Sequence, residues 1–475
     1  MCCVPTISNS SGSFVGTELE NDVSAFLGIQ YASAKRFCQP TDIKKYSSIV
    51  NAQTFGPQSP QVPGFMDEIL NTKSLPSSEE CLYLNIWKPT RVRERLPVLF
   101  WIHGGAYTNG TAATSWYDGA NLVRLGDVVV VSINYRLGPF GFIGDNNLGT
   151  LDQISALRWV NRNIEAFGGD PSNVTIFGES AGGSSVVALT ASDLTRGMFA
   201  KAWAMSPSLL QLRSIQDAQQ AKQKFLEAAK CSSLDRLSSM STQEIVDATR
   251  QMFVDAENYI STFTPTAGGA GLPLDIYAAS AKSKIPMVVG TNRDENRLWT
   301  ALNPSANQMS EQDARKIFEA ACGQRAASAW NIISRNREAL SPAQMVAALQ
   351  TEINFRVPAQ KLCERRATSD ANSWMYWFTW QTPVFDGAFG CCHALDLPFV
   401  FNNLDKPNVE MFTGSDPSRR EISSHFTSEL IQFAKYGTVS WPIYSADERH
   451  TLKIDIKTEL VVDPDSEIRQ IWADR

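Results

Sequence analysis

The stretch VTIFGESAG, at residues 174–182, decides the fold of this chain. Its first four residues form an apolar, β-branched run typical of a buried strand, and residues 181–191 have the composition of a helix. We therefore place Ser180 at a sharp strand-to-helix turn, which strains its backbone and exposes its Oγ atom. Small residues two positions before and after the serine leave room for this turn. The alternative is a plain strand-to-helix turn without chemistry.

Strand-like and helix-like segments alternate on both sides of this stretch. Residues 151–167 have helical spacing, and the GGDP sequence at 168–171 ends that helix. Further buried strands are expected at residues 96–102, 128–133, 199–205, 286–290 and 374–380. This alternation predicts an α/β fold with a mainly parallel sheet covered on both faces.

Two long, charged stretches with a helical pattern, residues 214–258 and 310–366, interrupt the alternation. No linker rich in Pro, Gly or Ser isolates them, so we interpret them as insertions that cover the strand ends. The prediction is one domain over residues 1–475.

Composition excludes several classes of protein. The chain has 475 residues, a net charge of −6 and no block of Lys or Arg, so nucleic acid is not an expected partner. No apolar run reaches the roughly 18 residues of a membrane helix, and no secretory signal is visible. The nine cysteines are an odd number without metal-like spacing, so we expect no metal, no cofactor and a cytoplasmic location. The oligomeric state is not indicated.

A serine nucleophile needs a base, which is normally histidine, and the chain has four. His103 begins the sequence HGGA at 103–106, a small-residue loop whose backbone N–H groups suit an oxyanion hole. His425 and His450 lie in charged surroundings and are expected on the surface. His393 is the best base by elimination.

The third member of a triad should be a carboxylate between the serine and the histidine, because α/β-hydrolases follow that chain order. The expected strand at 286–290 leads into Asp294 and Glu295. Both qualify, and spacing alone does not choose between them.

Together these motifs resemble the type-B carboxylesterase/cholinesterase family, which has the α/β-hydrolase fold. The similarity runs nearly from end to end. It is most specific at residues 167–182 and in EECLYLNIW at residues 79–87. The resemblance implies a serine carboxylic ester hydrolase that acts on small-molecule esters through an acyl-enzyme. The residues it implies are Ser180, Glu295 and His393 as the triad, and Gly105, Ala106 and Ala181 as the oxyanion hole.

The resemblance also implies two structural ion pairs, Arg36 with Glu79 and Arg136 with Asp170. An acyltransferase would use the same residues, and some relatives are non-catalytic binding proteins. The intact triad argues against a non-catalytic binding protein.

Departures from the family pattern are informative. Secreted relatives pair the cysteine matching Cys81 with one at the position of Ser59, so we expect Cys81 and the other eight thiols to be free. Cys391 and Cys392 adjoin the proposed base, and thiol reagents are expected to block the site there. Residues 71–81 hold no aromatic side chain, which argues against choline esters.

Overall fold

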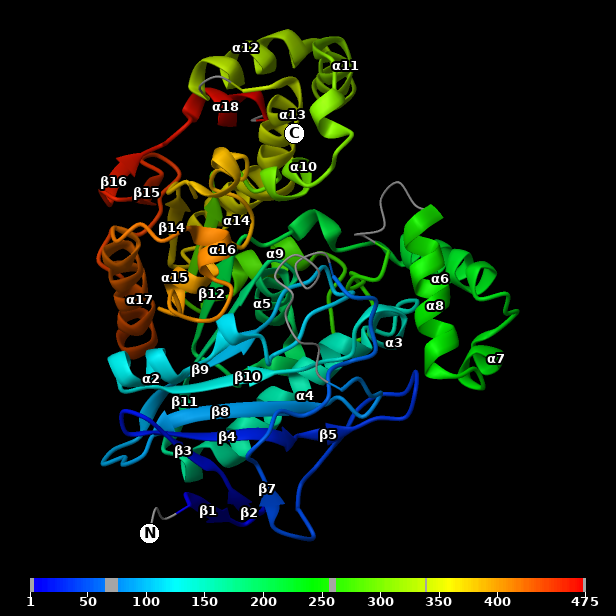
Figure 1. Cartoon of the computed structure of the whole chain (residues 1–475), viewed down its shortest axis with the longest axis vertical. Coiled ribbons are helices and arrows are strands. Elements are labelled where there is room, and N and C mark those ends of the chain that lie inside the picture. Colours follow the sequence, from blue (N-terminus) through cyan, green and yellow to red (C-terminus); the bar gives the residue numbers. More distant parts are fainter. Residues whose placement is uncertain (1–3, 65–75, 256–261, 338–339, 473–475) are drawn as a thin grey trace.

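The centre of the molecule is an eleven-stranded sheet (Figure 1). The computed structural model describes residues 4–64, 76–255, 262–337 and 340–472. In spatial order the strands are β16 (Glu459–Val462), β15 (His450–Ile454), β14 (Ser373–Phe378), β13 (Met287–Asn292), β12 (Lys201–Met205), β11 (Gly169–Glu179), β9 (Leu96–Ile102), β10 (Val129–Ile133), β8 (Tyr83–Pro89), β4 (Val23–Gln30) and β3 (Thr17–Leu19).

The middle of this sheet is parallel, from β15 across to β10, and its two edges are antiparallel. Every residue of β10, β12, β13 and β14 is buried, as expected for parallel strands covered on both faces. The predicted parallel sheet is therefore confirmed, with strand ends shifted by a few residues.

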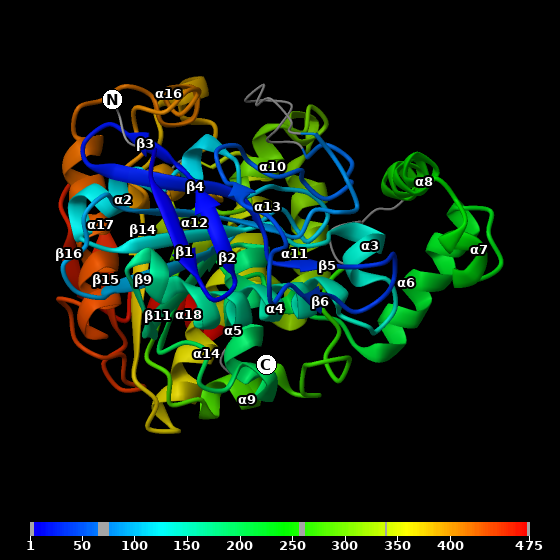
Figure 2. The ribbon, with the colours of Figure 1, turned by 90° about the horizontal axis from the view of Figure 1, so that it is seen from below.

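Helices cover both faces of the sheet. Along β9, Phe100 points into one apolar cluster and Trp101 into the other, as the alternation of a strand requires. Figure 2 shows the strands between α2 and α17 on one side and α4 and α5 on the other. The helices around the sheet include α2 (Ala120–Gly126), α4 (Leu148–Asn163), α5 (Ala181–Ala191), α9 (Ile276–Lys282), α15 (Leu397–Val400), α16 (Glu410–Thr413) and α17 (Arg419–Tyr436).

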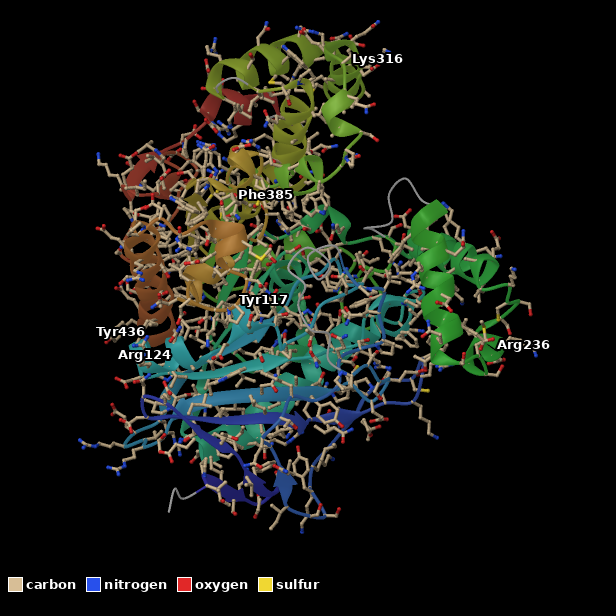
Figure 3. All side chains as sticks on the ribbon, viewed as in Figure 1. Tyr117, Arg124, Arg236, Lys316, Phe385 and Tyr436 are labelled. Carbon is tan, nitrogen blue, oxygen red and sulfur yellow. The ribbon has the colours of Figure 1, made fainter. Side chains whose placement is uncertain are left out.

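The two interrupting stretches are helical and form two lobes, one at the right and one at the top of Figure 1. The first contains α6 (Ile215–Ala228), α7 (Leu234–Ser238) and α8 (Thr242–Asp255). The second contains α11 (Glu311–Cys322), α12 (Ala326–Asn336) and α13 (Pro342–Thr351), packed with α18 (Ser466–Ile471) around an apolar cluster of their own. In Figure 3 the exposed side chains of Arg236 and Lys316 mark the outer parts of these lobes.

The end of the second stretch differs from the expectation. A π-helical turn, Glu352–Arg356, leads into α14 (Val357–Ala367), whose Leu362 packs in the cluster on the sheet. The second lobe also contacts the loop after β13, where the N–H of Asn296 donates to Oγ1 of Thr351 at the end of α13, at 3.0 Å. Residues 359–366 therefore belong to the cover of the sheet, while Val357 still packs in the cluster of the lobe.

The strands at the N-terminal end were not foreseen. A small separate sheet contains β1 (Thr6–Asn9), β2 (Gly12–Val15) and β7 (Val50–Asn51), and β5 (Ala32–Ser33) pairs with β6 (Thr41–Asp42). Within the described ranges, no helix combines the length and the apolar character needed to cross a bilayer.

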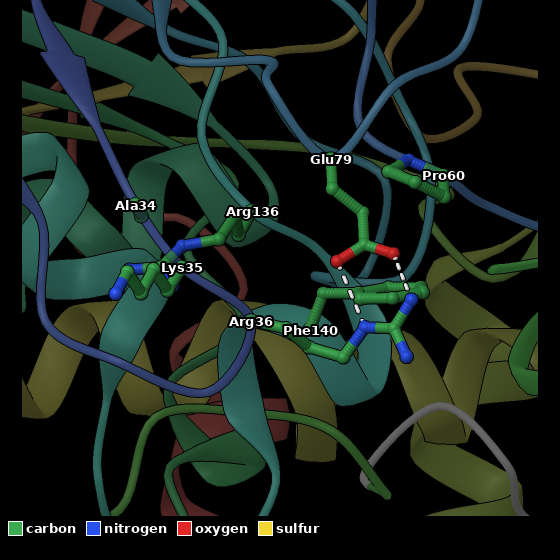
Figure 4. Close-up of a pocket in the computed structure, with 7 residues that line it drawn as sticks. All are labelled: Ala34, Lys35, Arg36, Pro60, Glu79, Arg136 and Phe140. Atoms are coloured by element: carbon green, nitrogen blue, oxygen red, sulfur yellow. Dashed lines mark hydrogen bonds and ion pairs between the residues drawn. The ribbon is translucent and has the colours of Figure 1, made fainter. Parts of the chain in front are cut away.

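One predicted ion pair is confirmed and the other is wrong. Arg36 Nε donates to Glu79 Oε2 at 2.9 Å, and a second bond joins the two groups (Figure 4). Arg136 instead pairs with Asp152 on α4, with Nη2 to Oδ1 at 2.7 Å. Asp170 accepts from Ser172 at the irregular start of β11. Helix α4 brings its carboxylate to Arg136, a contact that no short spacing in the sequence indicates.

Candidate active site

Ser180 lies on the predicted turn between β11 and α5. Its backbone has φ 58° and ψ −121°, a strained conformation for a residue with a side chain. Its N–H donates to Met205 O on the neighbouring strand at 2.9 Å, which holds this conformation. A Cβ on Gly182 would lie 2.0 Å from Ile102 O, and one on Gly178 would lie 2.6 Å from Gly182. The turn therefore requires both glycines, as the motif predicted.

The loop after β9 lies against this turn. A Cβ on Gly104 would come within 3.1 Å of Ser180 Cβ, so the loop backbone passes directly beside the serine. Gly105 and Ala106 have φ values of 105° and 52°. In the described part of the chain, the N–H groups of Gly105, Ala106 and Ala181 donate to no protein acceptor. They are available to an oxygen atom of a ligand.

His393 contacts Glu295 and not Asp294. Its Nδ1 lies 2.6 Å from Glu295 Oε2. The other oxygen, Glu295 Oε1, accepts from Ser206 Oγ at 2.6 Å and from Asn292 N at 2.7 Å. Glu295 is therefore fixed at both oxygens, and the choice left open by spacing goes to Glu295. Ser206 follows strand β12 without any motif, so the sequence offered no signal for it.

The Asp294 carboxylate has a different task. Its Oδ2 accepts from Cys391 N at 3.0 Å and lies 2.9 Å from the Arg293 guanidinium. It holds the loop that carries His393 without reaching the imidazole ring.

The expected hydrogen bond between Ser180 Oγ and His393 Nε2 is not formed. In the described structure Nε2 has no hydrogen-bond partner, and it lies 3.0 Å from Glu179 Oε1. The ring packs against Trp299 and Phe355, with centroids 5.0 and 4.9 Å away. Glu179 is a site residue that the sequence reasoning missed. An acidic side chain at the end of a buried strand was the available signal.

Three buried carboxyl groups surround the base. Burial lowers the pKa of His393, but Glu179 and then Glu295 raise it, and the net value is about 9. Burial raises the pKa of Glu179 to about 8, against the opposing effect of charged His393. Burial and then Glu295 raise the pKa of Asp396 to about 7. His393, Glu179 and Asp396 titrate as a coupled set.

The other histidines lie elsewhere. His103 Nδ1 is 2.8 Å from Gly104 O, and its Nε2 has no hydrogen-bond partner, so it makes no bond to Ser180. Burial lowers the pKa of His103 to about 4, which keeps the ring neutral. His425 and His450 are only partly exposed, and each faces a glutamate on its own segment.

The thiols beside the base are inaccessible. Cys391 and Cys392 are fully buried, and burial raises the pKa of both well above the ordinary value. This contradicts the expectation that reagents attack them. Cys81 lies beside the hydroxyl group of Ser59. Free thiols include Cys38, Cys81, Cys231, Cys363, Cys391 and Cys392, while Cys2 and Cys3 lie outside the described residues.

Comparisons with known proteins found matches over nearly the whole chain. The family model described as "Carboxylesterase family" matches residues 4–471. The chain is 34% identical to the para-nitrobenzyl esterase of Bacillus subtilis (strain 168), over 98% of this chain and 97% of that protein. It is 28% identical to the cholinesterase of Mus musculus, over 92% and 80%. A crystal structure of a carboxylesterase of Geobacillus stearothermophilus superposes with a TM-score of 0.86 at 32% identity, covering 98% and 99% of the two chains.

Proposed function

The chain belongs to the carboxylesterase family and is a carboxylic ester hydrolase with the α/β-hydrolase fold, and we propose that Ser180, His393 and Glu295 are its catalytic triad. The observation that carries this proposal is the contact of 2.6 Å between His393 Nδ1 and Glu295 Oε2. It leaves Nε2 on the side of the strained turn, 3.0 Å from Oε1 of Glu179, the residue directly before Ser180.

In this mechanism Ser180 Oγ attacks the ester carbonyl carbon while His393 Nε2 takes the hydroxyl proton. Glu295 stabilises the imidazolium that forms. The tetrahedral oxyanion accepts hydrogen bonds from the N–H groups of Gly105, Ala106 and Ala181. The imidazolium then protonates the leaving alcohol, and water, activated by the same base, hydrolyses the acyl-enzyme. The bond between Nε2 and Oγ forms in the substrate complex, where catalytic hydrogen bonds commonly tighten.

The substrates we propose are small-molecule esters with apolar groups. Trp299 and Phe355 pack on the base, so an acyl or alcohol group beside His393 meets aromatic surface. The relative from Bacillus subtilis is named for a para-nitrobenzyl ester, and its similarity over nearly the whole chain supports such a substrate class.

We also propose a reducing compartment, the cytoplasm, as the place of action. The thiols of Cys81 and Cys231 are free, and disulfides are rare where thiols are kept reduced.

The test of the triad compares two serine variants on a panel of para-nitrophenyl esters of increasing acyl length. Ser180→Ala should lower kcat/KM by several orders of magnitude while the protein stays folded, because the triad acts as a unit. Ser184→Ala, further along α5, is the control, since its side chain makes no hydrogen bond to His393 or Glu295. A folded Ser180→Ala protein with wild-type turnover would refute the mechanism.

A further inference from the structure

The loop that carries two of the proposed oxyanion donors is held by a side chain from outside it. Gln61 belongs to the segment 57–61, which lies between β7 and β8 in the chain. Its Oε1 accepts from Gly110 N–H at 2.6 Å, and its Nε2 donates to Gly110 O and to Ser59 O, each at 3.1 Å. In the described part of the chain, no other hydrogen bond reaches the backbone of Gly110. The amide of Gln61 thus pairs with Gly110 as a neighbouring strand would.

This contact reaches the beginning of the loop, because the loop folds back on itself. A Cβ on Gly110 would lie 2.6 Å from His103 Nδ1 and 2.7 Å from Gly104 O, so the backbone of Gly110 packs directly on both residues. Gly104 in turn lies against the nucleophile, since its own Cβ would come within 3.1 Å of Ser180 Cβ. Close backbone contacts therefore connect Gln61 to the turn at Ser180.

The backbone inside the loop is strained. Ala106 and Tyr107 have φ values of 52° and 60°, in the left-handed region that residues with side chains disfavour. The N–H groups of Thr108 and Asn109 donate to Gly105 O at 2.9 and 3.0 Å, which closes a tight turn around these two residues. A strained segment keeps its conformation only when the contacts around it hold it there. The amide of the neighbouring segment supplies such a contact.

The segment 57–61 is itself attached to other parts of the chain. Gln58 exchanges two backbone hydrogen bonds with residues 76–78, each of 3.0 Å. Ser59 Oγ accepts from Leu137 N–H at 3.1 Å. The segment is therefore a fixed base from which a side chain can hold the loop.

We propose that Gln61 is a positioning residue for the oxyanion hole: its amide fixes the loop so that the N–H groups of Gly105 and Ala106 face the developing oxyanion. The proposal rests on the proposed triad and oxyanion hole, and adds a residue that acts through Gly110. Removal of one oxyanion donor typically slows a reaction by about 10²–10³-fold. Loss of the Gln61 amide displaces donors without removing them, so we expect the effect of a displacement near 1 Å, about a hundredfold.

The test compares Gln61→Met with Gln61→Glu on a para-nitrophenyl ester. Methionine has a similar length but offers neither the amide oxygen nor the N–H, whereas glutamate keeps an oxygen that can accept from Gly110 N–H. In Gln61→Met we expect kcat and kcat/KM to fall together by about a hundredfold, with KM within about threefold, because the lost positioning acts in the transition state. Gln61→Glu should recover part of that loss.

A trifluoromethyl ketone of matching acyl length separates positioning from a general loss of structure. Ser180 Oγ adds to its carbonyl carbon, the serine proton passes to His393, and the former carbonyl oxygen becomes an oxyanion in the hole. Its inhibition constant should rise in proportion to the fall in kcat/KM across wild type, Gln61→Glu and Gln61→Met. The corresponding alcohol cannot form an oxyanion, and its inhibition constant should stay within about threefold.

Gln53→Met is the matched control for the loss of a side-chain amide. Gln53 Nε2 also donates to a backbone oxygen, Gly16 O, at 3.0 Å, but this bond joins segments of the N-terminal end and not the loop after β9. We expect kcat/KM of Gln53→Met to stay within about twofold of wild type. Circular dichroism and thermal unfolding check that both methionine variants are folded.

Each outcome decides the proposal. A fall in kcat matched by the inhibition constants of the ketone supports it. A folded Gln61→Met protein with wild-type kcat overturns it, and so does a fall in kcat with the ketone bound as tightly as before, or an equal fall in Gln53→Met. These results leave the triad standing, because Ser180→Ala tests the triad separately. If Gln61→Met does not fold, the turnover and ketone affinity of Gln61→Glu decide in the same way.

Discussion

At the scale of single residues, two adjacent acids have opposite tasks. Glu295 contacts the imidazole, whereas Asp294 holds the loop through Cys391 N. We expect Glu295→Gln to lower kcat/KM by about a thousandfold or more, because the amide cannot stabilise the imidazolium. Steady-state kinetics on a para-nitrophenyl ester, with circular dichroism as the folding check, measures this.

Asp294→Asn is the matched control. We expect it to lower the free energy of unfolding by about 1–3 kcal/mol through a weakened loop contact, with kcat within a few-fold of wild type. The reverse ranking of the two variants in kcat/KM would show that the acid is misassigned.

At the scale of elements, the turn at Ser180 depends on the absence of side chains around it. Gly182→Ala would bring a Cβ within 2.0 Å of Ile102 O, so α5 and β9 must separate. We expect kcat/KM to fall by about a hundredfold, the usual effect of a displacement near 1 Å at a catalytic group. Urea unfolding should show a loss of about 1–3 kcal/mol.

Gly197→Ala is the control variant, because it adds backbone strain at a position away from the turn at Ser180. Gly197 has φ 78° and open space around it, so an alanine there costs about 1–2 kcal/mol of stability without touching the turn. If Gly182→Ala lost only as much stability as Gly197→Ala and kept wild-type turnover, the geometric account of the turn would be wrong.

The ion pair between Arg136 and Asp152 connects the end of β10 to α4. Both side chains are buried, so Asp152→Asn leaves an uncompensated guanidinium in the core. We expect the free energy of unfolding to fall by about 3–5 kcal/mol in a denaturant titration. Asp170→Asn should change it by less than about 0.5 kcal/mol, because the oxygen of an asparagine can keep accepting the hydrogen bonds from Ser172. Equal losses of unfolding free energy in the two variants would support the pair of Arg136 with Asp170 that the resemblance implied.

The elements that the sequence predicted well are those with a strong apolar signal. The strands near residues 96–102 and 128–133 and the helix after Ser180 were placed within a residue. The strands before residue 90 were missed. β1 is short and half-exposed and lacks that signal, whereas β4 and β8 are longer and mostly buried and were overlooked. The proposed triad came from motif order and family resemblance. The partner of Arg136 and the position of Glu179 depend on packing between distant segments.

At the scale of the whole molecule, the state of the thiols tests the proposed compartment. We expect the mass of the native protein to stay unchanged on reduction, where each disulfide would add about two hydrogen masses. Millimolar reductant should leave activity intact. A gain in mass would contradict both the free thiols and the cytoplasmic proposal.

A thiol reagent adds a finer check. Cys38 is exposed and should react in the native protein, whereas Cys391 and Cys392 should react only after unfolding. Activity should survive the native labelling. Rapid loss of activity with modification of Cys391 or Cys392 would contradict their burial.

The central claim is that Ser180 forms the covalent intermediate. The most direct measurement is intact and peptide mass spectrometry after reaction with a fluorophosphonate, which traps an activated serine. We predict one adduct per chain, located on Ser180, that appears as ester hydrolysis disappears and is absent from His393→Asn. An adduct on another residue, or complete labelling of Ser180 with hydrolysis undiminished, would contradict the account.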